Sequence, residues 1–124
     1  MLSRVRTLTV LPRCDGRRKA IVLDFLYESG LIDKDKKIVD LDGADLSEAD
    51  LFRAQRSKAD LSRANLIEAN LIEANLSSAK LMEADLSGAD LSEAILDGAI
   101  VTNKQLDEAK SLKGATMPNG TKYA

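Results

Sequence analysis

Residues 59–98 read ADLSR ANLIE ANLIE ANLSS AKLME ADLSG ADLSE AILDG, with an alanine at every fifth position. The same register extends from Ala44 to Ala99, and a large side chain follows two positions after each alanine. That side chain is leucine except at Arg56 and Val101. A pattern held over twelve quintets indicates a repeat architecture, in which each unit contacts chiefly its neighbours.

A period of five fits neither a straight helix nor a flat strand. Five residues turn an α-helix through about 500°, which would spread the leucines around it. In a strand, an odd period would place successive leucines on opposite faces. The chain must therefore bend once per quintet. The residue before leucine is mostly Asp or Asn, whose short side chains accept hydrogen bonds from the backbone at turns. We expect coils that bury their leucines by stacking on one another.

The repeat unit, A(D/N)LXX, resembles that of the pentapeptide-repeat family over residues 39–108. The resemblance implies an all-β fold, a right-handed quadrilateral parallel β-helix with four quintets per coil. This length would give about three and a half coils, with strands stacked ~4.8 Å apart. Stacking in that register predicts two ion pairs between neighbouring coils, Arg53 with Glu73 and Arg63 with Glu83.

The sequence divides into three parts, a helical N-terminal cap over 1–38, the repeats over 39–108, and a capping tail over 109–124. The cap and the tail are expected to cover the open ends of the solenoid, since bare ends invite edge-to-edge pairing. Thr102 and Gln105 fit a capping box, which predicts a short helix reaching about Ser111.

The N-terminal cap is expected to contain a helix over Arg17–Ser29, N-capped at Asp15 and ended by Gly30, and a shorter one over Leu2–Val10. The apolar side of the longer helix is predicted to face the first coil; it consists of Ile21, Val22, Phe25 and Leu26. Residues 17–32 and the tail segment 111–122 resemble a cyanobacterial-type subgroup of the family. In longer relatives the first block follows a larger region, often membrane-associated, so the chain is expected to be a shortened member.

Composition excludes several chemistries. The chain has no His and one Cys, Cys14, which excludes a disulfide framework, His/Cys zinc sites and Ser–His–Asp catalysis. No phosphate-binding glycine loop or nucleophile elbow is present. We therefore expect no enzymatic activity, no cofactor, no metal and no small-molecule substrate. No apolar run approaches the ~18 residues of a membrane span, and a leader peptide is not recognisable, so the predicted location is cytoplasmic.

Charge is unevenly distributed. Residues 40–108 hold fifteen acidic and six basic side chains, whereas residues 109–124 hold three lysines and no acid. This favours an interaction or scaffold module that binds a protein partner through a rigid surface, with self-association as an option and no direct binding of nucleic acid. The alternative is a DNA mimic that binds DNA gyrase or another nucleic-acid-binding protein. That alternative comes from the resemblance, because some family members imitate duplex DNA.

Four residues are candidates for the partner surface: Phe52, Ile67, Ile72 and Arg56. The first three occupy outward positions of the repeat, with Phe52 stacked over Ile72. They form either an interface or an incidental exposure covered in part by the chain's own helices. Arg56 replaces a buried leucine. Either its stem packs and its guanidinium reaches solvent or an acid near the N-terminal cap, or it makes a specific contact with an anion or a partner.

Two further isoleucines, Ile95 and Ile100, replace the usual Asp or Asn of the repeat. We expect the C-terminal tail to bury both.

Overall fold

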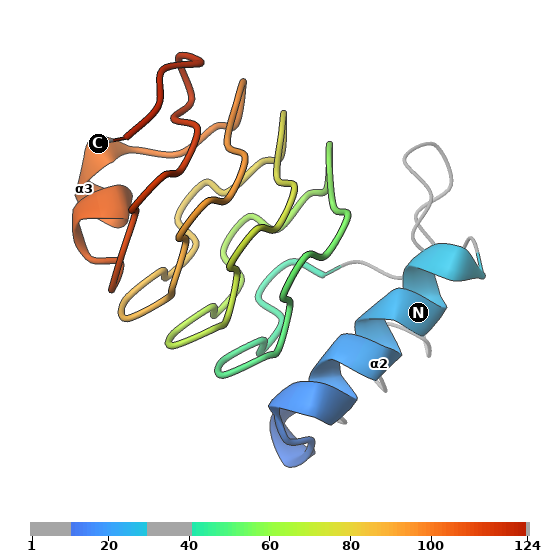
Figure 1. Cartoon of the computed structure of the whole chain (residues 1–124). Coiled ribbons are helices and arrows are strands. Elements are labelled where there is room, and N and C mark those ends of the chain that lie inside the picture. The colour runs from blue at the N-terminus through green and yellow to red at the C-terminus, as the bar shows by residue number, and fades with distance from the viewer. Residues whose placement is uncertain (1–10, 30–40, 124) are drawn as a thin grey trace.

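The computed structural model describes residues 11–29 and 41–123, and shows a stack of coils with a helix at each end (Figure 1). The elements are η1 (Leu11–Arg13), α2 (Gly16–Glu28) and α3 (Asn103–Asp107). The predicted helix over Leu2–Val10 and the helix end at Gly30 lie outside the described residues.

Neighbouring coils pair in parallel with a register of twenty residues. Asp45 bridges to Asn65 and Asn65 to Asp85, and the same spacing holds up to the bridge between Lys80 and Ile100. The Leu46 amide donates to the Asn65 carbonyl of the next coil at 2.8 Å, and the Asn65 amide donates back to Ala44 at 2.8 Å. Within the described residues each bridge is isolated, because the chain turns before a second residue can pair. The handedness of the solenoid stays a prediction.

A tight turn closes each quintet. The Ala44 amide donates to the Leu41 carbonyl at 2.9 Å, and this bond recurs in the following quintets. The residue before each alanine adopts a left-handed backbone, with φ of 73° at Gly43 and 58° at Glu68. The Asp or Asn before each leucine supports the turn: an oxygen of Asn65 accepts from the Ile67 amide at 3.0 Å. The predicted role of this position is confirmed.

The core is a column of alanine and leucine side chains along the axis of the coils. The inward leucines from Leu46 to Leu96 are at most 3% exposed, and the alanines beside them are mostly as well covered. Leu23 and Leu26 of α2 extend the core at one end, and Leu106 of α3 at the other.

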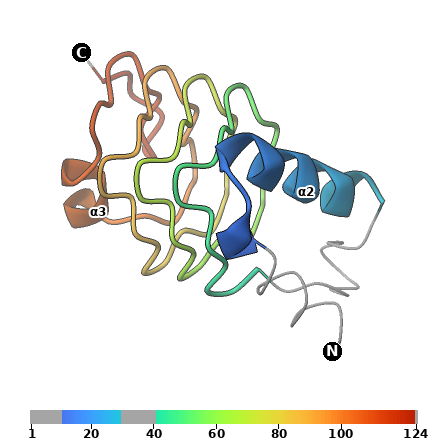
Figure 2. The ribbon, with the colours of Figure 1, turned by 90° about the horizontal axis from the view of Figure 1, so that it is seen from below.

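Helix α2 lies across the first coil, as predicted (Figure 2). Leu26 is buried and Val22 packs against the core, as expected, but the helix is rotated from the predicted orientation. Asp15 caps it by accepting from the Arg18 amide at 2.8 Å, which confirms the predicted N-cap. Its buried residues are Lys19, Leu23 and Leu26. Ile21 and Phe25, expected to face the coil, are 58% and 63% exposed. This part of the prediction is wrong.

The reason for this orientation is a polar contact at the start of α2. The carbonyl of Gly16 accepts from the Asp50 amide at 3.0 Å, which pairs a backbone group at the outer edge of the first coil. A Cβ at position 16 would lie 2.1 Å from the Glu48 carbonyl oxygen, so only glycine permits this approach. Once Gly16 and Lys19 contact the coil, Ile21 and Phe25 must point away from it.

At the C-terminal end, Thr102 and Gln105 form the predicted capping box. Helix α3 nevertheless ends at Asp107, short of the predicted Ser111, because the Glu108 carbonyl accepts from the Gly88 amide and the chain re-enters the stack. The pairing then continues with a one-residue offset, between Asp90 and Ser111 and between Ile95 and Thr116.

The last described residues turn back on themselves. Thr116 pairs antiparallel with Lys122, so the parallel ladder stops there. This tail does not cover Ile95 and Ile100, which are 40% and 49% exposed, so the prediction of their burial is wrong. Both occupy the bridge position of the repeat, which points outward. No helix in the described part of the chain is long and apolar enough to cross a membrane.

Candidate partner-binding face

Phe52 and Ile72 occupy the same corner of neighbouring coils. The Arg53 amide donates to the Ile72 carbonyl at 2.9 Å, which sets this register. Phe52 is 47% exposed and Ile72 is half-buried. The Arg53 guanidinium lies 5.0 Å from the centre of the Phe52 ring and pairs with Glu73. The predicted ion pair between Arg53 and Glu73 is thus confirmed, and it borders the apolar corner.

A shallow groove with a volume of about 510 Å³ runs beside Ile72. Glu68 and Asp90 supply carboxylates to its lining, Asn70 supplies an amide, and Lys110 supplies an amino group. The two carboxylates can accept hydrogen bonds from a lysine or arginine. We call Phe52, Ile72 and this groove the coil face.

Ile67 lies at a different corner from Phe52 and Ile72. Its positional equivalents on neighbouring coils are Ser47 and Ser87, and it is half-buried. It borders the groove through its neighbour Glu68 and does not extend the stacked pair. The structure therefore brings Phe52 and Ile72 together and leaves Ile67 beside them.

Arg56 is covered by α2 and is 9% exposed. Its guanidinium pairs with Asp24, donates to the Gln55 carbonyl at 2.7 Å, and lies 4.3 Å from the centre of the Tyr27 ring. These contacts support the intramolecular alternative for Arg56. They place it between α2 and the first coil, away from the coil face.

Lys19 makes a buried contact between α2 and the first coil that the sequence did not predict. It is 4% exposed, and its Nζ donates to Asp45 Oδ1 at 3.1 Å, to the Ser47 carbonyl at 2.8 Å and to Ser47 Oγ at 3.2 Å. Burial raises the pKa of Asp45, but hydrogen bonds from Ser47 and Lys19 outweigh it and hold the pKa below its usual value. A lysine in a basic cluster, Arg17-Arg18-Lys19, gives no signal that one member is buried.

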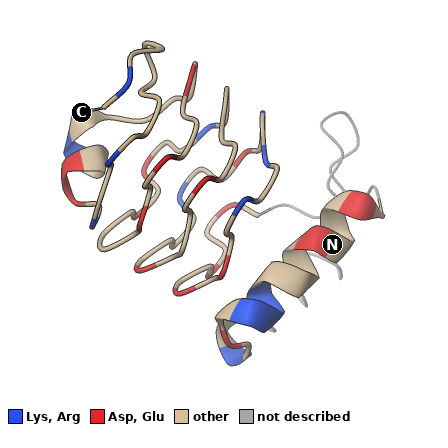
Figure 3. Cartoon of the chain, in the orientation of Figure 1, with Lys and Arg blue, Asp and Glu red and all other residues tan. Residues whose placement is uncertain are grey.

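Charges of both signs alternate over the coils (Figure 3). Arg63 does not pair with Glu83 as predicted. It binds Asp42 through two hydrogen bonds of 2.8 and 3.0 Å, and these bonds raise the pKa of the guanidinium. Asp42 precedes Arg63 by 21 residues, whereas the expected partner, Glu83, follows it by twenty. The Asp42 carboxylate presents both oxygens to Arg63, and Glu83 acts only as a longer-range charge.

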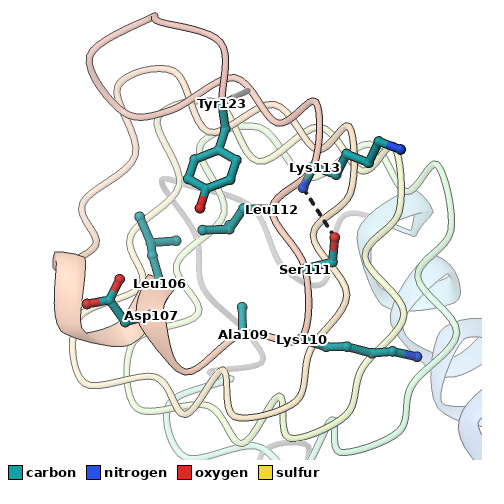
Figure 4. A pocket seen from close by; sticks show the side chains of 8 residues that line it. All are labelled: Leu106, Asp107, Ala109, Lys110, Ser111, Leu112, Lys113 and Tyr123. Carbon is teal, nitrogen blue, oxygen red and sulfur yellow. Dashed lines mark hydrogen bonds between the residues drawn. The ribbon is translucent and has the colours of Figure 1, made fainter.

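A second hollow, of about 310 Å³, lies at the C-terminal end (Figure 4). Leu106, Leu112 and Tyr123 point into it, whereas the amino groups of Lys110 and Lys113 extend away. No group of three or more potential metal ligands occurs within residues 11–29 and 41–123. Its lining mixes apolar side chains, Leu106, Ala109 and Leu112, with the polar groups of Asp107, Ser111 and Tyr123.

These features define a repeat solenoid. Its inward residues form the core, and its outward residues determine the charge and the apolar character of the surface. The family model Pentapeptide repeats matches eight copies, over residues 39–66 and 59–98. The chain belongs to the pentapeptide-repeat family through this stretch. Members of this family are generally repeat scaffolds without enzymatic activity.

Solved structures of the same family are similar to this chain. A pentapeptide repeat protein from Nostoc is 28% identical, with 78% of this chain and 74% of that chain covered and a TM-score of 0.38. One from Cyanothece is 34% identical, with 69% and 58% covered and a TM-score of 0.37. One from the Arabidopsis thaliana thylakoid lumen is 33% identical, with 63% and 61% covered and a TM-score of 0.29. The chain spans less than two thirds of the last two, and no curated protein matches it.

Proposed function

We propose that the repeats form a right-handed quadrilateral β-helix that works as a binding scaffold, and that the coil face is where a protein partner docks. The partner segment suited to this face carries an apolar side chain for the Phe52–Ile72 corner and a lysine or arginine for the groove. The observation that carries the proposal is the stacked pair of an exposed Phe52 and a half-buried Ile72 beside the carboxylates of Glu68 and Asp90.

The backbone around this face is fixed before any partner arrives. Each outward residue stands between a bridge position and a turn, both hydrogen-bonded to neighbouring coils. A face held in this way loses little conformational entropy on binding, which favours affinity for a given contact area. The equivalent position on the third coil is Ser92, so apolar residues at positions 52 and 72 are not needed for the repeat itself.

The test is a quantitative pull-down from the source cells with a Phe52→Ser, Ile72→Ser double variant. Serine suits both positions, because Ser92 occupies the same corner and donates to Asp90 at 2.6 Å. The matched control is Met82→Ser, since Met82 is 50% exposed at the equivalent position on another side of the solenoid. We expect a protein recovered by wild type and by the control to be lost with the double variant. Identical recovery by all three would refute the coil face, as would failure of the wild type to recover any protein.

The DNA-mimic alternative stays a prediction. No contact within the described residues favours it over the scaffold, because Arg53 and Arg63 each pair with an acidic side chain on the surface. A gyrase supercoiling assay tests it directly: inhibition at micromolar protein would support mimicry.

A further inference from the structure

Helix α2 has apolar side chains on two opposite sides. Leu23 and Leu26 face the first coil and are buried, whereas Ile21 and Phe25 point outward with exposures of 58% and 63%. Ile21 and Phe25 are one helical turn apart, so their side chains are neighbours on the outer face. For comparison, the side chain of Phe52 on the coil face has a lower exposed fraction, 47%. Two large, adjacent and exposed apolar residues on one helix are a feature that the stability of the coils does not require.

Charged residues flank this pair in a definite order. Arg17 lies one turn before Ile21, and Glu28 lies one turn after Phe25, all on the outer face of α2. The outer face therefore reads basic, apolar, apolar, acidic from the start of the helix to its end. Both charged residues are exposed.

This order is complementary to itself when a second α2 is laid antiparallel. A two-fold axis between Ile21 and Phe25 places Arg17 of each copy against Glu28 of the other, and Ile21 against Phe25. The macrodipoles of the two helices are then antiparallel as well, which is the favourable arrangement. A parallel arrangement would set like charges against each other.

From this self-complementarity we infer that two copies of the chain associate through the outer faces of α2, N-terminal end to N-terminal end. Figure 2 shows that α2 lies across one end of the stack, and Leu23 and Leu26 turn its inner face to the coils, so the outer face points away from them. The helix has thirteen residues and is about 20 Å long, and a contact of that size is small for a stable dimer. We expect a dissociation constant on the order of 10 µM.

The experiment is sedimentation equilibrium of the full chain over a range of concentrations at low ionic strength. The wild type should shift from monomer to dimer, whereas Ile21→Ser with Phe25→Ser should remain monomeric. The control Phe52→Ser should dimerise as the wild type does, which separates this contact from the coil face. Dimerisation of the Ile21 and Phe25 double variant would overturn the inference, and so would a wild type that stays monomeric throughout.

Charge reversal gives the sharper test, and it does not depend on the fold tolerating serine. Arg17→Glu alone or Glu28→Arg alone should each weaken self-association about ten-fold, because two attractive pairs become two repulsive ones. An equimolar mixture of the two single variants should restore it, since every pair in the mixed dimer is again opposite in charge. A mixture that stays monomeric would overturn the antiparallel arrangement. A non-identical partner helix on α2 would give that same result and would then be the explanation.

Discussion

The left-handed backbone at every corner predicts opposite effects for adding and for removing glycine. Among residues 41–123, nine non-glycine residues have a positive φ, and Glu68 is one of them at 58°. Gly43 occupies the same position of its quintet, at another corner of the first coil, with a φ of 73°. We predict that Glu68→Gly stabilises the protein and that Gly43→Ala destabilises it.

The magnitude follows from two opposing terms. A residue with a Cβ costs about 1–2 kcal/mol in the left-handed region relative to the right-handed one. Glycine loses more conformational freedom on folding, which costs about 0.5–1 kcal/mol. The difference gives a gain of about 0.5–1 kcal/mol for Glu68→Gly and a similar loss for Gly43→Ala. Among the described residues, no atom lies within 4 Å of a Cβ added at Gly43. Gly43→Ala therefore measures the free-energy cost of the left-handed backbone without a steric clash.

The assay is urea denaturation followed by far-UV circular dichroism, because the chain has no tryptophan. Lys58→Gly serves as a second site, with a φ of 63° and no acidic residue at the equivalent position of the next coil, Ser78. Ser57→Gly is the matched control, since Ser57 directly precedes the left-handed residue and should only lose stability. If Glu68→Gly and Lys58→Gly lower the free energy of unfolding as much as Ser57→Gly does, the reasoning about corner strain is wrong.

Two further predictions concern charged contacts. Lys19→Met should lower the free energy of unfolding by about 2–3 kcal/mol, because the half-buried Ser47 and Asp45 lose a charged donor. Thermal melting should show a clear drop relative to the exposed control Lys104→Met, and equal melting temperatures for the two variants would contradict the prediction. Hydrogen bonds from the Ser87 side chain and amide lower the pKa of Asp85 below its usual 3.8. The Asp85 carboxylate therefore stabilises the fold above pH 3.8, and this stabilisation is lost as the pH falls through the folded-state pKa. Asp85→Asn, which keeps the acceptor as Asn65 does, should lose less stability below about pH 4 than wild type in acid titrations; equal losses would refute this.

Features set by local chemistry could be predicted from the sequence. The regular spacing of alanine and leucine predicted the inward column, because small and large apolar side chains that recur in every quintet are buried together when the coils stack. Asp15 and Thr102 could be assigned as helix caps because a capping side chain acts on amides two or three residues away. The register of four quintets per coil, which the family resemblance implied, placed Arg53 beside Glu73, but it also placed Arg63 beside Glu83, whereas Arg63 binds Asp42.

Features set by contacts between distant segments could not be predicted. The rotation of α2 depends on where Lys19 and Gly16 meet the first coil, whereas the predicted face was chosen from the apolar residues of the helix alone. The end of α3 depends on the Gly88 amide taking up the Glu108 carbonyl. Of the candidate surface, Phe52 and Ile72 could be paired by counting, whereas the burial of Arg56 required α2 to be in place.

The ends of a parallel stack decide whether it associates as a closed pair or as a fibre. At the C-terminal end, the antiparallel pairing of Thr116 with Lys122 stops the parallel ladder. At the N-terminal end, the Gly16 carbonyl and Lys19 Nζ occupy backbone groups of the first coil that another ladder would need. Backbone pairing between copies is therefore blocked at these positions. The outer face of α2 offers a two-fold contact, and such a contact closes at two copies because each copy uses its only α2.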